Sequence, residues 1–294
     1  MDLGLDGRVA LVLGGSRGLG RASALELLRE GASVMLAARG EGVLREAAER
    51  LGRDAEQPGR LDPVTADDAD IWLANRGRRP ARERVAWTAG DLSSAETPER
   101  LVRATVDRFG RLDVVVVNAG GPPPGPFESI TEEQWRGSVD LTFLSAVRTV
   151  RAALPYLRDE RVRRSGGGRI VFIESGSVKQ LVPNLVTSNA IRSAVQGLMK
   201  TLSIELAPDG ILVNAVGPGR LDTDRVRKLD EDTAQRTGRS PRQVREDHER
   251  TIPLGRYGDP AELGAVVAFL ASSRASYITG TLIPVDGGQV RAMV

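Results

Sequence analysis

The chain has 294 residues, 40% of them hydrophobic, which is enough to bury the core of a single α/β domain. It contains no cysteine and one histidine, His248, which excludes disulfides, thiolate metal sites and multi-histidine zinc sites, so we expect no metal. The net charge is +2 and the sequence pI is near 9.3, but arginines and acids are interleaved, so we expect no nucleic-acid partner.

The sequence also argues against a membrane partner or export. No stretch approaches the ~20 apolar residues that span a bilayer. The N-terminal residues lack the basic region and apolar run of a signal peptide. We therefore expect a cytoplasmic protein that acts on a small-molecule substrate.

The first predicted elements are a buried strand over residues 8–13 and a helix beginning near 21, joined by a glycine-rich turn. Glycine lets the backbone turn tightly and lets a phosphate approach the main-chain N–H groups, and the helix adds its positive N-terminal end. The turn therefore predicts a nucleotide-phosphate site, which we assign to Gly14, Ser16, Arg17, Gly18, Leu19 and Gly20.

The second predicted strand, residues 33–38, ends at Arg39. An acid at this place would accept hydrogen bonds from an adenosine ribose and favour NAD. Arg39 and Arg17 instead suit the 2′-phosphate, because guanidinium groups bind phosphate bidentately. The sequence therefore favours NADP(H) over NAD(H), unless these arginines point to solvent.

A helix over 41–51 leads into an unusual segment, about 52–84, which is rich in proline and glycine. A short helix near 66–75 would have Trp72 as its one large apolar residue. Loops longer than about 15 residues are uncommon in compact domains, so we expect an accessory flap or a partly mobile insertion. It precedes a strand and should therefore lie at the sheet end opposite the cofactor, without a catalytic role.

The third strand, 85–89, is followed by Asp91 and Leu92, where the carboxylate would accept from an adenine amino group or serve as a cap or turn residue. A helix over 98–109 leads to a fully apolar and therefore central fourth strand, 113–117. That strand ends in Asn118, Ala119 and Gly120, whose small-residue turn would border the cofactor.

The remaining elements repeat this alternation. Helices are expected over 132–157, 188–206 and 260–270, and strands over 169–173, 211–216 and 281–285. A polar, charge-rich segment fills about 224–250. Strands alternating with helices predict an α/β fold, a Rossmann-type doubly wound parallel sheet of about seven strands in a three-layer sandwich, and no linker divides the single domain 1–294.

The order of these motifs resembles that of the short-chain dehydrogenase/reductase family over nearly the whole chain. The matching features are the turn at 14–20, Asp91-Leu92, Asn118-Ala119-Gly120, Ser175, Val213-Asn214-Ala215, Pro218-Gly219 with Thr223, and the tail at 278–288. The resemblance implies NAD(P) across the strand ends, with Pro218, Gly219, Leu221 and Thr223 at the nicotinamide. It also implies a substrate lid over about 220–255, and a homodimer or homotetramer formed through the two long central helices.

The chain departs from the family at its catalytic pair. The family uses Tyr-x-x-x-Lys, with a serine thirteen residues before the tyrosine, but none of the three tyrosines here precedes a lysine at that spacing. Counting thirteen from Ser175 gives Ser188, and four more give Arg192. Thr142 stands where the family has a further asparagine.

This change matters because the serine hydroxyl is far less acidic than a tyrosine hydroxyl, whose pKa is about 10. Arginine stays protonated, so Arg192 would supply positive charge and bind ribose hydroxyls without relaying a proton. Losing a general acid typically costs about 10²–10⁴ in rate. Another group must supply the proton, or the reaction must not need one.

Few residues offer a substitute. Lys179 follows the fifth strand and would reach the pocket or face solvent, and His248 lies in the lid segment. Glu174 would point to the side of the strand opposite Ser175, so we discount it. Ser177 and Asn184 have no distinguishing feature. The candidate catalytic residues are Ser175, Ser188, Arg192 and Lys179.

Three functions remain open at this point. The first is an NADP(H)-dependent oxidoreductase that transfers hydride to a carbonyl, imine or enone. The second is a non-redox isomerase, dehydratase or cyclase on the same fold. The third is a catalytically silent nucleotide-binding protein. The intact glycine turn and the loop at 218–223 favour the first, although fold analogy alone does not settle function.

Overall fold

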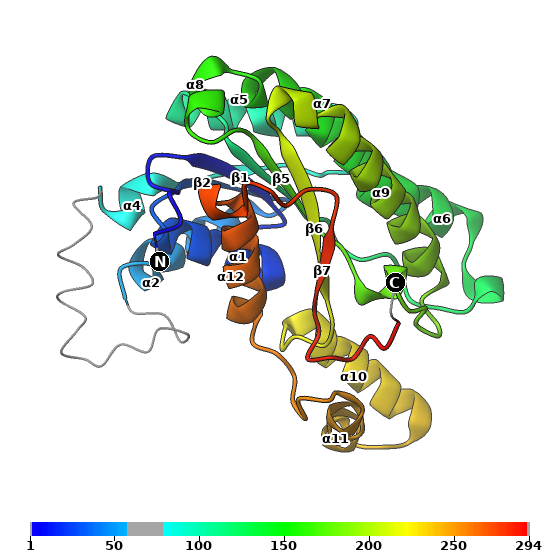
Figure 1. The fold of residues 1–294 in the computed structure, drawn as a ribbon. Coiled ribbons are helices and arrows are strands. Elements are labelled where there is room, and N and C mark those ends of the chain that lie inside the picture. The colour runs from blue at the N-terminus through cyan, green and yellow to red at the C-terminus, as the bar shows by residue number, and fades with distance from the viewer. Residues whose placement is uncertain (1, 58–78, 293–294) are drawn as a thin grey trace.

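The computed structural model describes residues 2–57 and 79–292, so the short helix expected near 66–75 lies outside the described residues. Seven parallel strands form one sheet in the order β3-β2-β1-β4-β5-β6-β7 (Figure 1). They are β1 Val9–Leu13, β2 Ser33–Ala38, β3 Val85–Ala89, β4 Val114–Val117, β5 Arg169–Ile173, β6 Leu212–Pro218 and β7 Leu282–Val285. The predicted doubly wound sheet is confirmed, with strand ends within two residues of the expected ones.

Helices cover both faces of the sheet and bury it in two hydrophobic clusters. The first cluster packs one face against α1 (Gly18–Arg29), α2 (Glu41–Asp54) and α12 (Pro260–Ala271). The second packs the other face against α5 (Thr97–Phe109), α7 (Ser145–Leu157) and α9 (Val186–Glu205). Strands buried on both faces explain the continuous apolar runs, such as the four valines of β4.

The helix expected over 132–157 is present with an irregular centre. It consists of α6 (Glu132–Ser138), a π-helical stretch at Val139–Leu144, and α7. Such bulges frequently occur at functional sites. Here the bulge contains Thr142, which is buried and whose hydroxyl has no hydrogen-bond partner among the described residues.

The remaining α-helices in the described part of the chain are α4 (Ala81–Arg84), α8 (Glu160–Arg164), α10 (Asp224–Thr237) and α11 (Pro241–Thr251). α10 and α11 lie beyond the end of the sheet, beside β7 in Figure 1. They occupy the polar segment 224–250, for which the sequence analysis gave no helices. The described helices include none long and apolar enough to cross a membrane.

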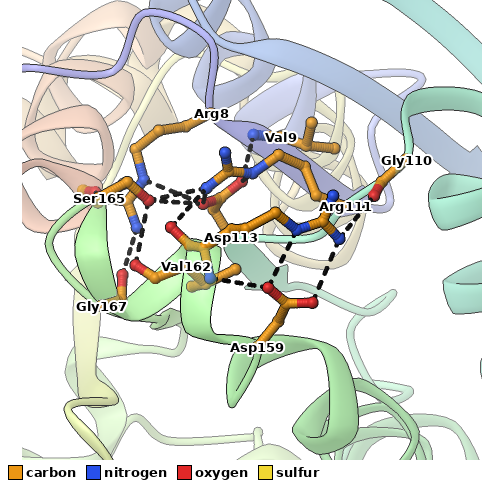
Figure 2. A network of polar contacts seen from close by, with 11 residues as sticks. Arg8, Val9, Gly110, Arg111, Asp113, Asp159, Val162, Ser165 and Gly167 are labelled. Atoms are coloured by element: carbon orange, nitrogen blue, oxygen red, sulfur yellow. Dashed lines mark hydrogen bonds and ion pairs between the residues drawn. The ribbon is translucent and has the colours of Figure 1, made fainter.

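A buried polar network closes the opposite end of the sheet, where the strands begin (Figure 2). Asp113, fully buried, accepts hydrogen bonds from the Val9 N–H at 2.9 Å and from Arg111 Nε at 2.8 Å. The buried Arg8 guanidinium lies 3.7 Å from the Asp113 carboxylate and donates to backbone carbonyls, including that of Gly167. This network ties β1 to β4 and fixes the strands whose far ends form the site.

Candidate active site

A cavity of about 690 Å³ opens at the carboxyl ends of the strands. Loops that follow β1, β4, β5 and β6 line it, together with residues of α9, α10 and α11. Ligands of open α/β sheets bind in this kind of crevice, where the strand order reverses. That reversal falls between β1 and β4 here.

The glycine turn forms the cavity wall after β1 and cannot accept larger residues. A Cβ on Gly20 would stand 2.4 Å from the Gly14 carbonyl oxygen, which is backbone and cannot move aside. Gly14 has a φ of +62°, and Asn118 Nδ2 donates to the Leu13 carbonyl at 3.2 Å, which fastens β4 to the turn. Close approach of a phosphate to backbone N–H groups is therefore possible, as an NAD(P) pyrophosphate requires.

Most of the residues predicted to bind the cofactor line the cavity. Those that line it are Gly14, Arg17, Gly18, Leu19, Asn118, Ala119, Gly120, Arg192, Pro218, Gly219, Leu221 and Thr223. Ser16 lies in the turn and Gly20 in the first turn of α1, and neither lines the cavity. Leu92 packs in the hydrophobic core, where it is 7% exposed.

Arg17 and Arg39 are exposed, and neither forms an ion pair within the described ranges. Arg39 lies outside the cavity lining but near Asp91, whose pKa is lowered chiefly by hydrogen bonds from Ser93 and further by Arg39. Asp91 accepts those bonds from the Ser93 N–H at 3.0 Å and hydroxyl at 2.8 Å. Asp91 is thus a turn residue in this structure.

Ser175, Ser188 and Arg192 all line the cavity. Ser175 caps the short helical turn Gly176–Val178, and its oxygen accepts from the Ser177 N–H at 3.1 Å. Because that bond uses an oxygen lone pair, the hydroxyl hydrogen remains available for a substrate oxygen. Ser188 and Arg192 come from one face of α9, four residues apart.

Arg192 reaches back to the end of β5. Its Nη1 donates to the Ile173 carbonyl at 3.2 Å and lies 3.6 Å from Glu174 Oε2. Its side chain is only 11% exposed, and Arg225 of α10 interacts with it electrostatically. Arg192 is therefore a fixed cation at the edge of the cavity.

The sequence analysis discounts Glu174 as a proton donor, and the structure places it in the cavity lining. Its side chain does take the side of the strand opposite Ser175, the side on which Ile170 and Phe172 face α9. However, α9 brings Arg192 to that same side, and both residues line the cavity. Burial raises the pKa of Glu174 to about 7, although the Arg192 cation acts to lower it.

The other residues considered as substitutes for the family's catalytic tyrosine differ in whether they reach the cavity. Lys179 is exposed and does not line the cavity, so the structure does not bring it to Ser175. His248 lines the cavity from α11, and its Nε2 lies 3.8 Å from Asp230. Burial and then the nearby Arg220 lower the pKa of His248, so the neutral imidazole is favoured. Ser177 is buried at the cavity wall.

A buried acid anchors α10 to the neighbouring loops. Asp230 of α10 accepts hydrogen bonds from Arg220 Nη1 at 2.7 Å and from the Tyr257 hydroxyl at 2.8 Å. Thr223 caps α10 by accepting from the Val226 N–H at 3.3 Å. No cluster of three or more His, Asp or Glu side chains suited to a metal ion occurs in the part of the chain that the structure describes.

Comparison with known proteins identifies the family. The "short chain dehydrogenase" model matches residues 8–71, and the "Enoyl-(Acyl carrier protein) reductase" model matches residues 68–289. A 3-oxoacyl-[acyl-carrier-protein] reductase from Thermotoga maritima is 30% identical over 97% of this chain and 99% of its own length. An NADPH-dependent reductase from Bacillus subtilis is 29% identical over 97% and 99%.

Solved structures of reductases have the same fold as this chain. L-sorbose reductase from Gluconobacter frateurii, complexed with NADPH and L-sorbose, superimposes with a TM-score of 0.84, at 28% identity and with both chains covered completely. Sequence, fold and the position of the cavity thus lead to one assignment. The chain belongs to the short-chain dehydrogenase/reductase family of oxidoreductases.

Proposed function

We propose that this protein is an NADP(H)-dependent oxidoreductase that transfers hydride between the nicotinamide and a carbonyl or alcohol carbon of a small molecule. One observation carries the proposal: the glycine turn, Ser175 and Arg192 all border a single cavity. A hydride donor held along the turn would lie beside a hydroxyl that can polarise a carbonyl. An imine or enone is an alternative acceptor of the same hydride.

The preference for NADP(H) rests on Arg17 and Arg39. Both flank the end of the turn where the adenosine ribose would lie, and neither has a carboxylate within ion-pair distance among the described residues. Two unpaired guanidinium groups suit a phosphate monoester. The sorbose reductase with NADPH and the NADPH-dependent relative from Bacillus subtilis support this choice.

NADP(H), when bound, supplies or accepts the hydride, and the residues of this chain orient and polarise the reactants. Ser175 would donate its hydroxyl hydrogen to the substrate oxygen, while its own oxygen stays held by the Ser177 N–H. Ser188 would donate a second hydrogen bond. Arg192 would hold the nicotinamide ribose and supply positive potential as negative charge develops on the substrate oxygen. Ser188 and Arg192 stand at the positions of the family's tyrosine and lysine.

The rest of the chain would serve this site. We propose one catalytic domain over 1–294 with an insertion at about 52–84 and a lid at about 220–255, in which α10 and α11 cover the substrate. A homodimer or homotetramer through α6–α7 and α9 is consistent with Ile204, which is 69% exposed on α9. We expect the protein to be cytoplasmic.

A substrate screen tests the proposed activity. Purified protein is mixed with NADPH and a panel of ketones, aldehydes, imines and enones, and nicotinamide absorbance is followed. We expect oxidation of NADPH with at least one compound. Removing one hydrogen-bond donor to a developing oxyanion typically costs about 10²–10³ in kcat, and Ser175→Ala should show this loss. NADPH binding without oxidation by any compound would favour the non-redox alternative.

A further inference from the structure

The proposed reaction needs a proton, and the cavity contains few groups able to give one. Its ionisable side chains are Arg17, Glu174, Arg192, Arg220, Asp224, Arg225 and His248. The arginines stay protonated and cannot act as acids. Asp224 is 74% exposed, and its carboxylate is paired with Arg227 at 2.6 Å.

Glu174 differs from these groups in burial and in partners. Its side chain is 3% exposed, and its Oε2 accepts no hydrogen bond within the described part of the chain. A buried carboxylate oxygen without a hydrogen bond is costly, which favours the protonated form. Glu174 and Ser175 follow β5 directly, and both line the cavity in which a substrate would lie.

We propose that Glu174 is the proton donor and acceptor that takes over the role of the missing tyrosine. During reduction, hydride from NADPH adds to the carbonyl carbon and the C=O π pair moves to oxygen. The O–H bond of the Glu174 carboxyl breaks, and its proton ends on the substrate oxygen, which gives the alcohol, NADP⁺ and a Glu174 carboxylate. Solvent then restores the proton. This inference rests on the proposed function.

The surroundings of Glu174 suit both charge states. Burial favours the neutral acid, and Arg192, 3.6 Å away on α9, stabilises the carboxylate that remains after proton transfer. Among the described residues, Arg192 is the charged group that acts directly on Glu174, and Arg225 of α10 faces Arg192. The opposing effects give the pKa of about 7, and a general acid is most effective when its pKa lies near the working pH.

Kinetics of Glu174→Gln test the proposal, because glutamine keeps the shape and loses the proton. With a carbonyl that wild-type protein reduces, we expect kcat to fall about 10²–10⁴-fold while NADPH affinity is unchanged. In wild type, kcat should decline as pH rises above about 7, and this decline should vanish in the variant. Glu49→Gln, an exposed substitution on α2, is the matched control and should behave as wild type. Wild-type kcat and pH profile in Glu174→Gln would overturn the proposal.

A second readout needs no substrate. Nuclear magnetic resonance of protein labelled at the glutamate carboxyl carbons follows each carboxyl through a pH titration. We expect one resonance that titrates near pH 7 and is missing from Glu174→Gln. Titration of Glu174 near the ordinary value of about 4.3 would refute the proposal. If no carbonyl oxidises NADPH, the proposed function fails in the screen, whereas this titration still decides whether Glu174 holds a proton.

Discussion

Replacing Glu174 by glutamine should change how stability depends on pH. Between pH 4.5 and about 7 the folded carboxyl keeps its proton, whereas the carboxyl of the unfolded chain ionises. The folded state then binds more protons, so the free energy of unfolding of wild-type protein falls as pH rises through this window. Glutamine does not titrate, so this decrease in the free energy of unfolding is absent from the variant.

The magnitude follows from the raised pKa. A shift from 4.5 to about 7, at about 1.4 kcal/mol for each tenfold change in proton affinity, corresponds to about 3 kcal/mol. Relative to wild type, Glu174→Gln should therefore gain about 2–3 kcal/mol in free energy of unfolding between about pH 5 and pH 8, and nothing more above that range.

Urea unfolding at several pH values, at one protein concentration, measures this difference. Glu49→Gln serves again as the control, since its side chain is exposed, and its difference from wild type should stay constant. A constant difference between Glu174→Gln and wild type over the same range would refute the reasoning. It would mean that Glu174 has an ordinary pKa in the folded protein.

Two further predictions concern the ends of the sheet. Asp113→Ala leaves the buried Arg8 without its carboxylate partner. Removing one partner of a buried ion pair typically lowers the free energy of unfolding by about 3–5 kcal/mol, so thermal unfolding should show a large fall in Tm. Gly20→Ala should abolish NADPH binding in a titration, because its Cβ would collide with Gly14, whereas Gly42→Ala on α2 meets no atom within 4 Å and should retain full affinity. Full NADPH affinity in Gly20→Ala would contradict the assignment of the turn.

Much of the fold could be predicted because buried strands and glycine turns leave local signals. The valine run of β4 and the apolar run of β2 gave their strands to within a residue. The π-helical stretch at 139–144 has no such signal, since it depends on how the helix packs on its neighbours. The helices α10 and α11 did have local signals, because Thr223 and Ser240 cap them, but the high polarity of the segment obscured those signals.

The sequence predicted those parts of the candidate site that a single continuous segment forms. The turn and the loop after β6 could be assigned from their residues, and both line the cavity. The place of Glu174 in the site could not be assigned in this way. Alternation along the strand predicts which face of the sheet its side chain takes, but it does not predict which helix residue packs on that face. The contact with Arg192 joins residues 18 positions apart and follows only from the packing of α9 on the sheet. Lys179, which directly follows the short helical turn Gly176–Val178, does not line the cavity.

The most direct test of the account is a titration of the protein with NADPH and with NADH, followed by nicotinamide fluorescence. Hydrogen bonds to charged groups contribute about 1.5–3 kcal/mol each, so two phosphate-binding arginines predict NADPH affinity at least about 100-fold above that for NADH. The double variant Arg17→Ala, Arg39→Ala should bind both nucleotides equally weakly. Equal affinity of wild-type protein for the two nucleotides would contradict the proposed roles of these arginines, and binding of neither would contradict the proposed redox function.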